Sequence, residues 1–94
     1  MKHYEFLKLV PGTDPLEVQE KLWKGLRKLD DALDWMNHPV IYRSCRPEDD
    51  FDMMLAVNIE QEERMSEYLS HPIRQKMEEK VGSYIRERMT FDHY

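Results

Sequence analysis

The side chains most suited to proton transfer near neutral pH or to metal binding include four histidines and one cysteine: His3, His38, His71, His93 and Cys45. An imidazole titrates near neutral pH, so each histidine could accept and return a proton during a reaction. A zinc site needs ligands at close, recurrent spacings, and these five residues show none of them. The three glycines are also too dispersed to form a phosphate-binding loop. We therefore expect no metal centre and no bound cofactor.

The most informative stretch is 68–72, which reads Tyr-Leu-Ser-His-Pro. Proline cannot continue a helix, and it pushes the residue before it toward extended dihedral angles. We therefore interpret His71 as the cap of a helix that begins at Pro72, in preference to an acid or a base. Tyr68 falls on the apolar face of the preceding helix. That position favours a buried ring, with a ligand contact as the alternative.

Size and composition indicate a single soluble domain spanning residues 1–94. The chain has 40% hydrophobic and 35% charged residues, and its formal net charge is −5. This negative charge disfavours binding to nucleic acid or to an anionic membrane. No stretch resembles a membrane span or a signal peptide. Cys45 has no partner for an internal disulfide and lies in an expected strand, so we expect a buried or half-buried thiol in a reducing compartment, the cytoplasm.

Hydrophobic periodicity predicts the order strand, helix, strand, strand, helix, strand. Alternation at period two predicts strands over 2–10, 40–46, 51–60 and 84–94, and spacings of three and four predict helices over 15–33, 61–70 and 73–81. Asp14 and Pro15 give the first helix its cap and its first residue. We expect Gly82 to end the last helix in a left-handed conformation. In the last strand, Ile85, Met89 and Phe91 are expected to share one face.

This order predicts an α+β fold of the ferredoxin-like βαββαβ type, a four-stranded antiparallel sheet with its helices on one face. Strands one and three are expected to be central. Strand one has apolar side chains on both sides, Tyr4 and Phe6 on one and Leu7 and Leu9 on the other. Because helices cover only one face, the other face needs a second copy to cover it, which predicts a homodimer and a dimeric α/β barrel. The sequence leaves open which pair forms that face.

Several of these features together resemble a known family. They are His3 near the start of strand one, Leu7-Lys8-Leu9 followed by Pro11-Gly12, the stretch 68–72, and the closing Phe91-Asp92-His93-Tyr94. Over essentially the whole chain they resemble the stress-responsive A/B barrel domain, often called Dabb. The resemblance implies a ferredoxin-like protomer and a homodimer whose two sheets pack into a barrel.

Most members of that family have no assigned reaction, but one plant member closes polyketide rings in a cavity between sheet and helices. The positions of this sequence that match its site are His3, Tyr68, Arg74 and Asp92, with His71 holding the turn between them. Arg74 departs from the pattern, because many members carry a second histidine there. A guanidinium stays protonated and accepts no hydrogen bond, so it cannot take a proton as an imidazole would.

Two pairings are expected among these residues. Arg74 near Asp92 would form a salt bridge that ties the last helix to the last strand, the alternative being an anion-binding arginine. His3 could also face Asp92 across the paired strands, which would tune its imidazole near neutral pH.

We therefore predict a stress-responsive A/B barrel protein that acts as a non-catalytic homodimer or binds a small apolar ligand. The candidate ligand contacts are His3, Tyr68, His71, Arg74 and Asp92. The alternative is a cyclase-like or lyase-like enzyme that transfers protons on a small aromatic or polyketide-like substrate. That enzyme would use His3 with Asp92 and would orient its substrate through Tyr68.

Overall fold

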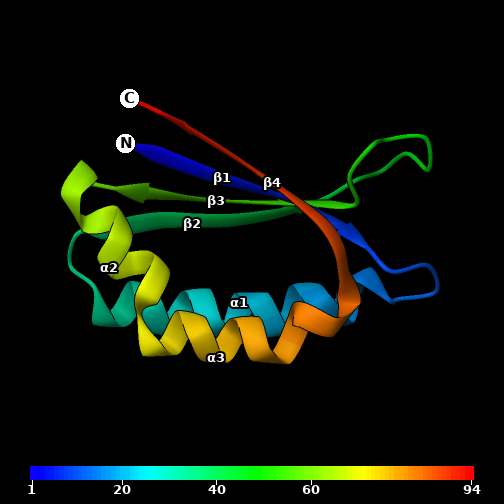
Figure 1. Ribbon diagram of the computed structural model, residues 1–94, viewed down its shortest axis with the longest axis horizontal. Coiled ribbons are helices and arrows are strands. Elements are labelled where there is room, and N and C mark those ends of the chain that lie inside the picture. Colours follow the sequence, from blue (N-terminus) through cyan, green and yellow to red (C-terminus); the bar gives the residue numbers. More distant parts are fainter.

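A four-stranded sheet forms one layer of the molecule and three helices form the other (Figure 1). The computed structural model describes residues 1–94. Its elements are β1 (Lys2–Leu9), α1 (Pro15–Ala32), β2 (Met36–Arg43), β3 (Met53–Ile59), α2 (Met65–Ser70), α3 (Pro72–Val81) and β4 (Ile85–His93), with single 3-10 turns at Glu62–Arg64 and Gly82–Tyr84. Both chain ends lie at the same end of the sheet (Figure 1).

The strand order across the sheet is β2-β3-β1-β4, and every neighbouring pair is antiparallel. Strands β1 and β3 are therefore central, as their two-sided apolar patterns predict. Helices α1 and α3 run together beneath one face of the sheet (Figure 1). The predicted ferredoxin-like βαββαβ fold is confirmed. The opposite face, which we call the outer face, carries no helix.

Helix α1 begins at the predicted residue and packs closely against α3. The carboxylate of Asp14 accepts a hydrogen bond from the Leu16 amide at 3.0 Å, and Pro15 opens the helix. Gly25 then faces α3, where an added Cβ would lie 2.6 to 2.8 Å from side-chain atoms of Met77. Glycine is therefore what lets the two helices approach one another at this point.

Strand β1 turns its polar and aliphatic side to the helices. His3, Glu5, Leu7 and Leu9 are all buried on that side, with exposed fractions of 3%, 2%, 1% and 6%. Tyr4 and Phe6 belong to the outer face, and their rings stack with centroids 6.4 Å apart. The structure thus answers the question that the sequence left open: the uncovered side of strand one is the aromatic side.

Strand β4 does not alternate as predicted. Lys8 lies opposite Glu87, but Leu9 lies opposite Ile85, so one residue of β4 is unpaired in a β-bulge. One extra residue reverses the side to which the preceding side chains point. Ile85 therefore packs against the core beneath the sheet. The prediction that it shares a face with Met89 and Phe91 was wrong.

The second strand begins earlier than predicted, because Asn37, His38 and Pro39 belong to it instead of forming a loop. The pairing with β3 shifts register between Asn37 and Val40, and His38 has a φ of 55°. This irregularity lets a proline sit in an edge strand. The strand also ends earlier than predicted, at Arg43. Cys45 therefore lies beyond the strand, and its thiol is exposed. The prediction of a buried or half-buried cysteine was wrong.

Gly82 does not provide a left-handed end for α3. Its φ of −54° and ψ of −39° are helical, and its amide donates to the Glu78 carbonyl. The chain then continues into the 3-10 turn at Gly82–Tyr84 before β4 begins. The predicted left-handed conformation was wrong, since the helix ends by tightening into this turn.

Candidate functional site

His3 lies on β1 between two carboxylates. Strand pairing places it opposite Asp92, and its Nδ1 lies 2.5 Å from Oδ1 of that residue. Its Nε2 lies 3.5 Å from Oε2 of Glu5, a distance at which attraction between charges matters more than hydrogen bonding. Burial lowers the pKa of His3, but its contacts with Glu5 and Asp92 outweigh burial and raise the pKa above its usual value. The site therefore favours an imidazolium that donates to Asp92.

Glu5 is the most enclosed charge of this region, with 2% of its surface exposed. Its Oε1 accepts a hydrogen bond from Nη2 of Arg74 at 3.0 Å, and Nη1 of Arg88 lies 3.6 Å from the same oxygen. Burial raises the pKa of Glu5, but His3 and Arg74 together outweigh burial and lower the pKa below its usual value. Glu5 is thus an anion surrounded by cations.

Arg74 on α3 does not pair with Asp92, and that prediction was wrong. Besides Glu5, it lies 3.6 Å from Glu78 one helical turn later, and it donates to the Leu69 carbonyl at 3.3 Å. Asp92 is instead occupied by His3, because β1 lies beside β4 in the sheet. The arginine does tie the last helix to the sheet, but to its central strand β1.

Tyr68 on α2 is fully buried, and its hydroxyl has no hydrogen-bond partner. Its ring meets the ring of His3 edge-on at a centroid distance of 5.9 Å. The guanidinium of Arg74 lies 5.4 Å from the centroid of the same ring, within range of a cation–π interaction. Burial raises the pKa of the Tyr68 hydroxyl strongly. The phenol therefore stays protonated, as a ring packed between two cations.

His71 stands apart from this group and caps α3. Its Nδ1 accepts a hydrogen bond from the Ile73 amide at 3.1 Å, and its backbone is extended with ψ of 136°. The predicted capping role is confirmed. An imidazole that accepts from a backbone amide must be neutral at that nitrogen, so this contact also fixes its tautomer.

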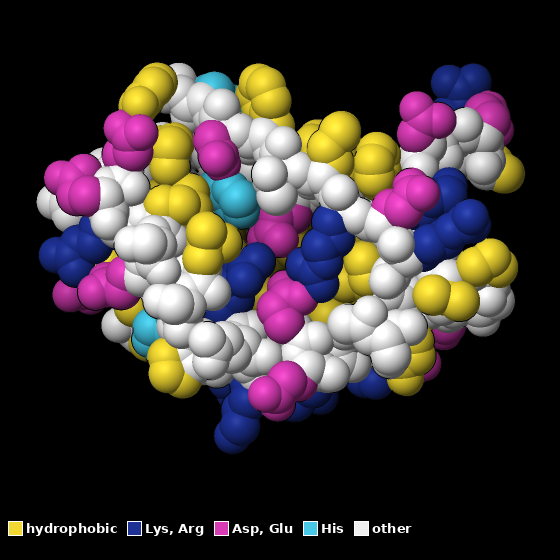
Figure 2. Space-filling model, viewed as in Figure 1, with side chains coloured by type: hydrophobic (Ala, Val, Ile, Leu, Met, Phe, Trp, Pro, Cys, Tyr) yellow, Lys and Arg dark blue, Asp and Glu magenta, His cyan; other side chains and the backbone are white.

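Together these residues form one band of alternating charge, which we call the ion cluster: His3, Glu5, Arg74, Glu78, Arg88 and Asp92. Arg88 closes the band by binding Glu78 with two nitrogens. Charged side chains of both signs and a histidine gather in the band between β4 and α3 (Figure 2). Breaking a buried ion pair leaves an uncompensated charge and is costly, so the cluster helps to hold α3 against β1 and β4.

Four buried polar atoms within or beside the ion cluster have no hydrogen-bond partner. They are Nε2 of His3, Oε2 of Glu5, the Tyr68 hydroxyl and Nε of Arg74. No hollow of the molecule is lined by these residues, so the side chains pack directly against one another. Asp92 is the member most open to solvent, with 43% of its side chain exposed. Any outside molecule that exchanged a proton with His3 would therefore approach past Asp92.

Sequence reasoning missed Glu5, Glu78 and Arg88 as members of the ion cluster. The signal for Glu5 is its position: it shares the side of β1 with Leu7 and Leu9, so a face buried by those leucines buries the glutamate as well. Arg88 shares the helical side of β4 with Asp92, as alternation predicts, but its approach to Glu5 and Glu78 depends on how α3 lies against the sheet. Its pairing opposite Leu7 appears only in the structure.

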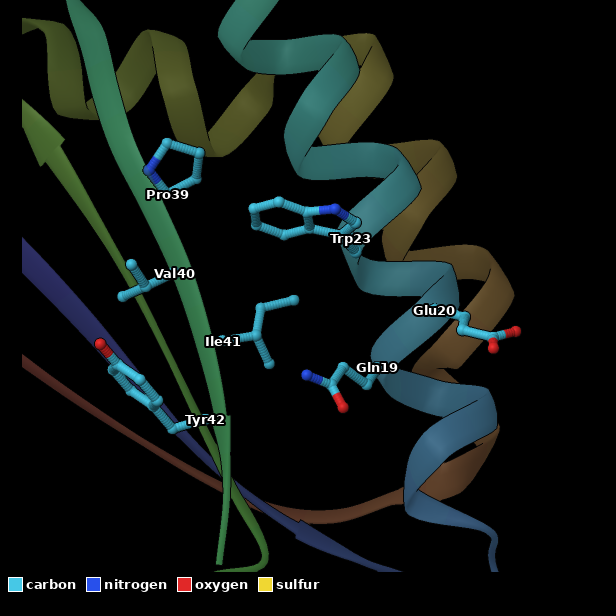
Figure 3. Close-up of a pocket in the computed structure, with 7 residues that line it drawn as sticks. All are labelled: Gln19, Glu20, Trp23, Pro39, Val40, Ile41 and Tyr42. Carbon is cyan, nitrogen blue, oxygen red and sulfur yellow. The ribbon is translucent and has the colours of Figure 1, made fainter.

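A separate apolar groove lies between α1 and the edge strand β2. Its volume is about 370 Å³, and it is lined by Gln19, Glu20, Trp23, Pro39, Val40, Ile41 and Tyr42. The indole of Trp23 points toward Pro39 across the opening, whereas the carboxylate of Glu20 points away from it (Figure 3). This volume is in the range of small-molecule sites. None of the residues predicted to bind a ligand lies here.

The structure holds no group of three or more histidine, cysteine, aspartate or glutamate side chains that could ligate a metal ion. Among the helices, none combines the length and the apolarity needed to cross a membrane.

The sequence matches the family described as the stress responsive A/B barrel domain, Dabb, and the match covers residues 1–94. The chain belongs to the Dabb family. No curated protein matches this Dabb domain in sequence.

Solved structures share the fold of this Dabb domain at low sequence identity. A dimeric protein of unknown function with a ferredoxin-like fold from Bacteroides fragilis is 15% identical, with 98% of this chain and 92% of that chain covered and a TM-score of 0.84. A Dabb family protein with a ferredoxin-like fold from Mesorhizobium loti is 14% identical over 99% and 93% of the two chains, with a TM-score of 0.73. A hydroxynitrile lyase from Passiflora edulis is 8% identical over 96% and 87%, with a TM-score of 0.75. At these identities the likeness shows the fold alone.

Proposed function

We propose that this Dabb domain works as a homodimer in which the outer faces of two sheets pack together. The observation that carries the proposal is the composition of that face. Its apolar members come from all four strands: Tyr4, Phe6, Val40, Tyr42, Met54, Ala56, Met89 and Phe91. Tyr42, Met89 and Phe91 are 59%, 51% and 58% exposed in the single chain. A contiguous apolar patch of this kind marks an interaction site.

Self-pairing is favoured over another partner for two reasons. The centre of the face carries no charged side chain, which suits an isologous contact between copies. The similar protein from Bacteroides fragilis is described as dimeric, which supports the same arrangement here.

The dimer is tested by placing a charge on the outer face. Phe91→Glu is expected to give monomers in size-exclusion chromatography with light scattering, because two carboxylates would be buried in a symmetric interface. Leu16→Glu is the matched control, since Leu16 is 50% exposed at the start of α1, away from the sheet. The control should stay dimeric. Monomers in both variants, or dimers in both, would reject the proposed face.

We also propose that the dimer is not an enzyme and that the ion cluster is structural. His3 and Tyr68 are 3% and 0% exposed, and the imidazole already contacts a carboxylate on each side. A catalytic base must reach a substrate proton at hydrogen-bonding distance. Packing within the protomer leaves these two residues no open volume in which a substrate could meet them.

If the protein binds a small apolar ligand, we propose that the ligand occupies the groove between α1 and β2. Its walls are the indole of Trp23 and the side chains of Pro39 and Ile41, with the Gln19 amide pointing inward as a polar contact (Figure 3). A small, neutral, apolar molecule fits these walls.

Nile red, a neutral dye, tests the site. Its fluorescence should rise on binding, and Trp23→Ala should weaken the binding about tenfold or more. Leu69→Ala, which removes an exposed apolar side chain elsewhere, should leave it unchanged. An equal loss of dye binding in both variants would exclude the groove as the binding site.

A proton-transferring enzyme is the second candidate, and the unpartnered Nε2 of His3 beside the unpartnered Tyr68 hydroxyl is what favours it. An aromatic hydroxynitrile is a suitable probe, with release of the aldehyde as the readout. If the ion cluster is structural, the hydroxynitrile should be cleaved no faster with the protein than without it. Cleavage that is lost in Asp92→Asn, while the melting temperature is retained, would establish the enzyme instead.

The family description and Cys45 support a proposal for the cellular role. We propose that the protein acts in a stress response, as the family description suggests. The unpaired and exposed thiol of Cys45 suits a reducing compartment, and we propose the cytoplasm. The proposal predicts that Cys45 is fully reactive toward a thiol reagent in freshly isolated protein. A thiol already blocked in a disulfide would contradict it.

A further inference from the structure

Five lysines gather around one hollow on the helical side of the molecule. The hollow lies in the seam between α1 and α3 and has a volume of about 160 Å³. Its rim is Lys21, Lys24, Lys28, Lys76 and Lys80, and Gly25, Ile73 and Met77 complete the lining. These are five of the seven lysines in a chain whose net charge is −5, and no acidic residue lines the hollow.

The concentration of charge follows from how the two helices pack. On α1 the lysines recur at spacings of three and four, and on α3 Lys76 and Lys80 are four apart, so each helix presents its lysines along one side. The absence of a side chain at Gly25 lets α1 lie against Met77 of α3. This close approach brings the two rows of ammonium groups to the same seam.

Only one of these five lysines forms an ion pair within the protein. Lys21 pairs with Glu17 at 3.2 Å and lies 4.9 Å from the ring centroid of Tyr84. The other four lysines of the seam have no carboxylate within ion-pair distance. Like charges one helical turn apart repel each other, so an anion bound along the seam would relieve that repulsion.

We propose that this seam, the lysine seam, binds a small phosphorylated molecule that carries two or more phosphate groups in a row. Ammonium groups bind phosphate oxygens as point charges, and an elongated row of lysines matches an elongated row of phosphates. The hollow is smaller than an ordinary drug-sized pocket, which suits phosphate groups lying on a short apolar floor of Ile73 and Met77. The negative charge of the rest of the protein repels a long polyanion such as nucleic acid but tolerates a compact one.

The lysine seam lies on the side of the helices, opposite the outer face of the sheet, and dark blue side chains project from that side in Figure 2. A dimer formed through the sheets would leave it open. Each protomer would therefore carry one such site, and binding there would not require the dimer to separate.

Inorganic tripolyphosphate is the probe that tests the site, by isothermal titration calorimetry at low ionic strength. One site per chain is expected. Lys24→Gln with Lys76→Gln should weaken binding about tenfold or more, because two charge contacts are lost. Lys2→Gln with Lys8→Gln is the matched control: it removes the same charge from the two lysines outside the seam. The affinity of that control for tripolyphosphate should lie within about twofold of the affinity of the unaltered protein.

Three outcomes would overturn the proposal. The first is absence of tripolyphosphate binding, and the second is an equal loss in the two double variants, which would mean that net charge alone matters. The third distinguishes a lipid surface from a free ligand: cosedimentation with vesicles of anionic phospholipid, combined with no binding of tripolyphosphate, would assign the lysine seam to a membrane. Circular dichroism of each variant shows whether the fold is retained; no change is expected, because Lys24 and Lys76 are exposed and Lys2 and Lys8 are only half-buried.

Discussion

Replacing Glu5 by glutamine tests whether the ion cluster holds the helices to the sheet. Glutamine has nearly the same size and keeps an oxygen that can accept the hydrogen bond from Arg74. The substitution therefore removes the negative charge that lies between His3 and Arg74 and changes little else. Any decrease in the free energy of unfolding then measures what the negative charge of Glu5 contributes to stability.

The expected loss is large because Glu5 is enclosed by its partners. Its carboxylate lies 3.0 Å from Arg74, 3.5 Å from His3 and 3.6 Å from Arg88, and only 2% of the residue is exposed. Removing one partner of a buried ion pair costs about 3–5 kcal/mol. Because the glutamine keeps one hydrogen bond, we expect the lower end, about 3 kcal/mol. Domains of this size are stable by only about 5–15 kcal/mol in total, so the effect is easily measured.

Urea unfolding of the unaltered and Glu5→Gln proteins measures this difference, at one protein concentration because a dimer's apparent stability depends on concentration. Glu48→Gln is the control for the chemical change. Glu48 pairs with Arg46 at 3.1 Å, but both side chains are about two-thirds exposed, at 65% and 68%. An exposed pair contributes at most about 1 kcal/mol. Equal losses in the two variants would refute the reasoning that burial makes the cluster matter.

The pH dependence gives the same comparison a second readout. The pKa of His3 is raised, so its contribution is fully present below the ordinary histidine pKa of about 6.5 and is lost as pH rises through the folded value. The pKa of Glu5 is lowered, so its contribution is present above the ordinary value of about 4.3 and is lost as pH falls through the folded value. The free energy of unfolding of the unaltered protein should exceed that of Glu5→Gln by the largest amount between these two pH limits, and this difference should decline in alkaline solution. The difference should not vanish there, because Arg74 stays charged. A difference that keeps growing as the pH rises would contradict the expectation.

Four further substitutions test single features of the fold and of the ion cluster. Gly25→Ala should destabilise the protein by about 1–3 kcal/mol in urea unfolding, since its new methyl group would clash with α3, whereas Gly82→Ala, with nothing within 4 Å, should be neutral or stabilising. His71→Ala should cost about 1 kcal/mol in the same assay through loss of the cap, and no loss would mean that the proline alone sets the turn. Asp92→Asn should lower the pKa of His3 in an NMR titration, and an unchanged pKa would show that Glu5 alone raises it.

The order of elements could be predicted because local signals agree with the tertiary structure. Asp14 and Pro15 are local signals that mark the start of α1, and the proline after His71 forces the turn that separates α2 from α3. The pairing of His3 with Asp92 was also accessible, since it follows from placing the first and last strands side by side.

Other features depend on contacts that no local pattern encodes. Both sides of β1 are apolar in sequence, and only the helices decide that the side of Tyr4 and Phe6 is left uncovered. A single bulged residue in β4 puts Ile85 on the helical side, and alternation alone could not reveal it. The partner of Arg74 was mistaken because α3 lies over the central strand β1, so that Glu5 is the nearer carboxylate.

The central claim is that a second copy covers the outer face of the sheet, and sedimentation equilibrium over a dilution series into the micromolar range tests it most directly. One chain has a mass of 11.5 kDa. A particle of twice that mass is expected throughout the series, and Phe91→Glu should reduce it to a single chain. A well-behaved single chain at every concentration of the unaltered protein would contradict the account.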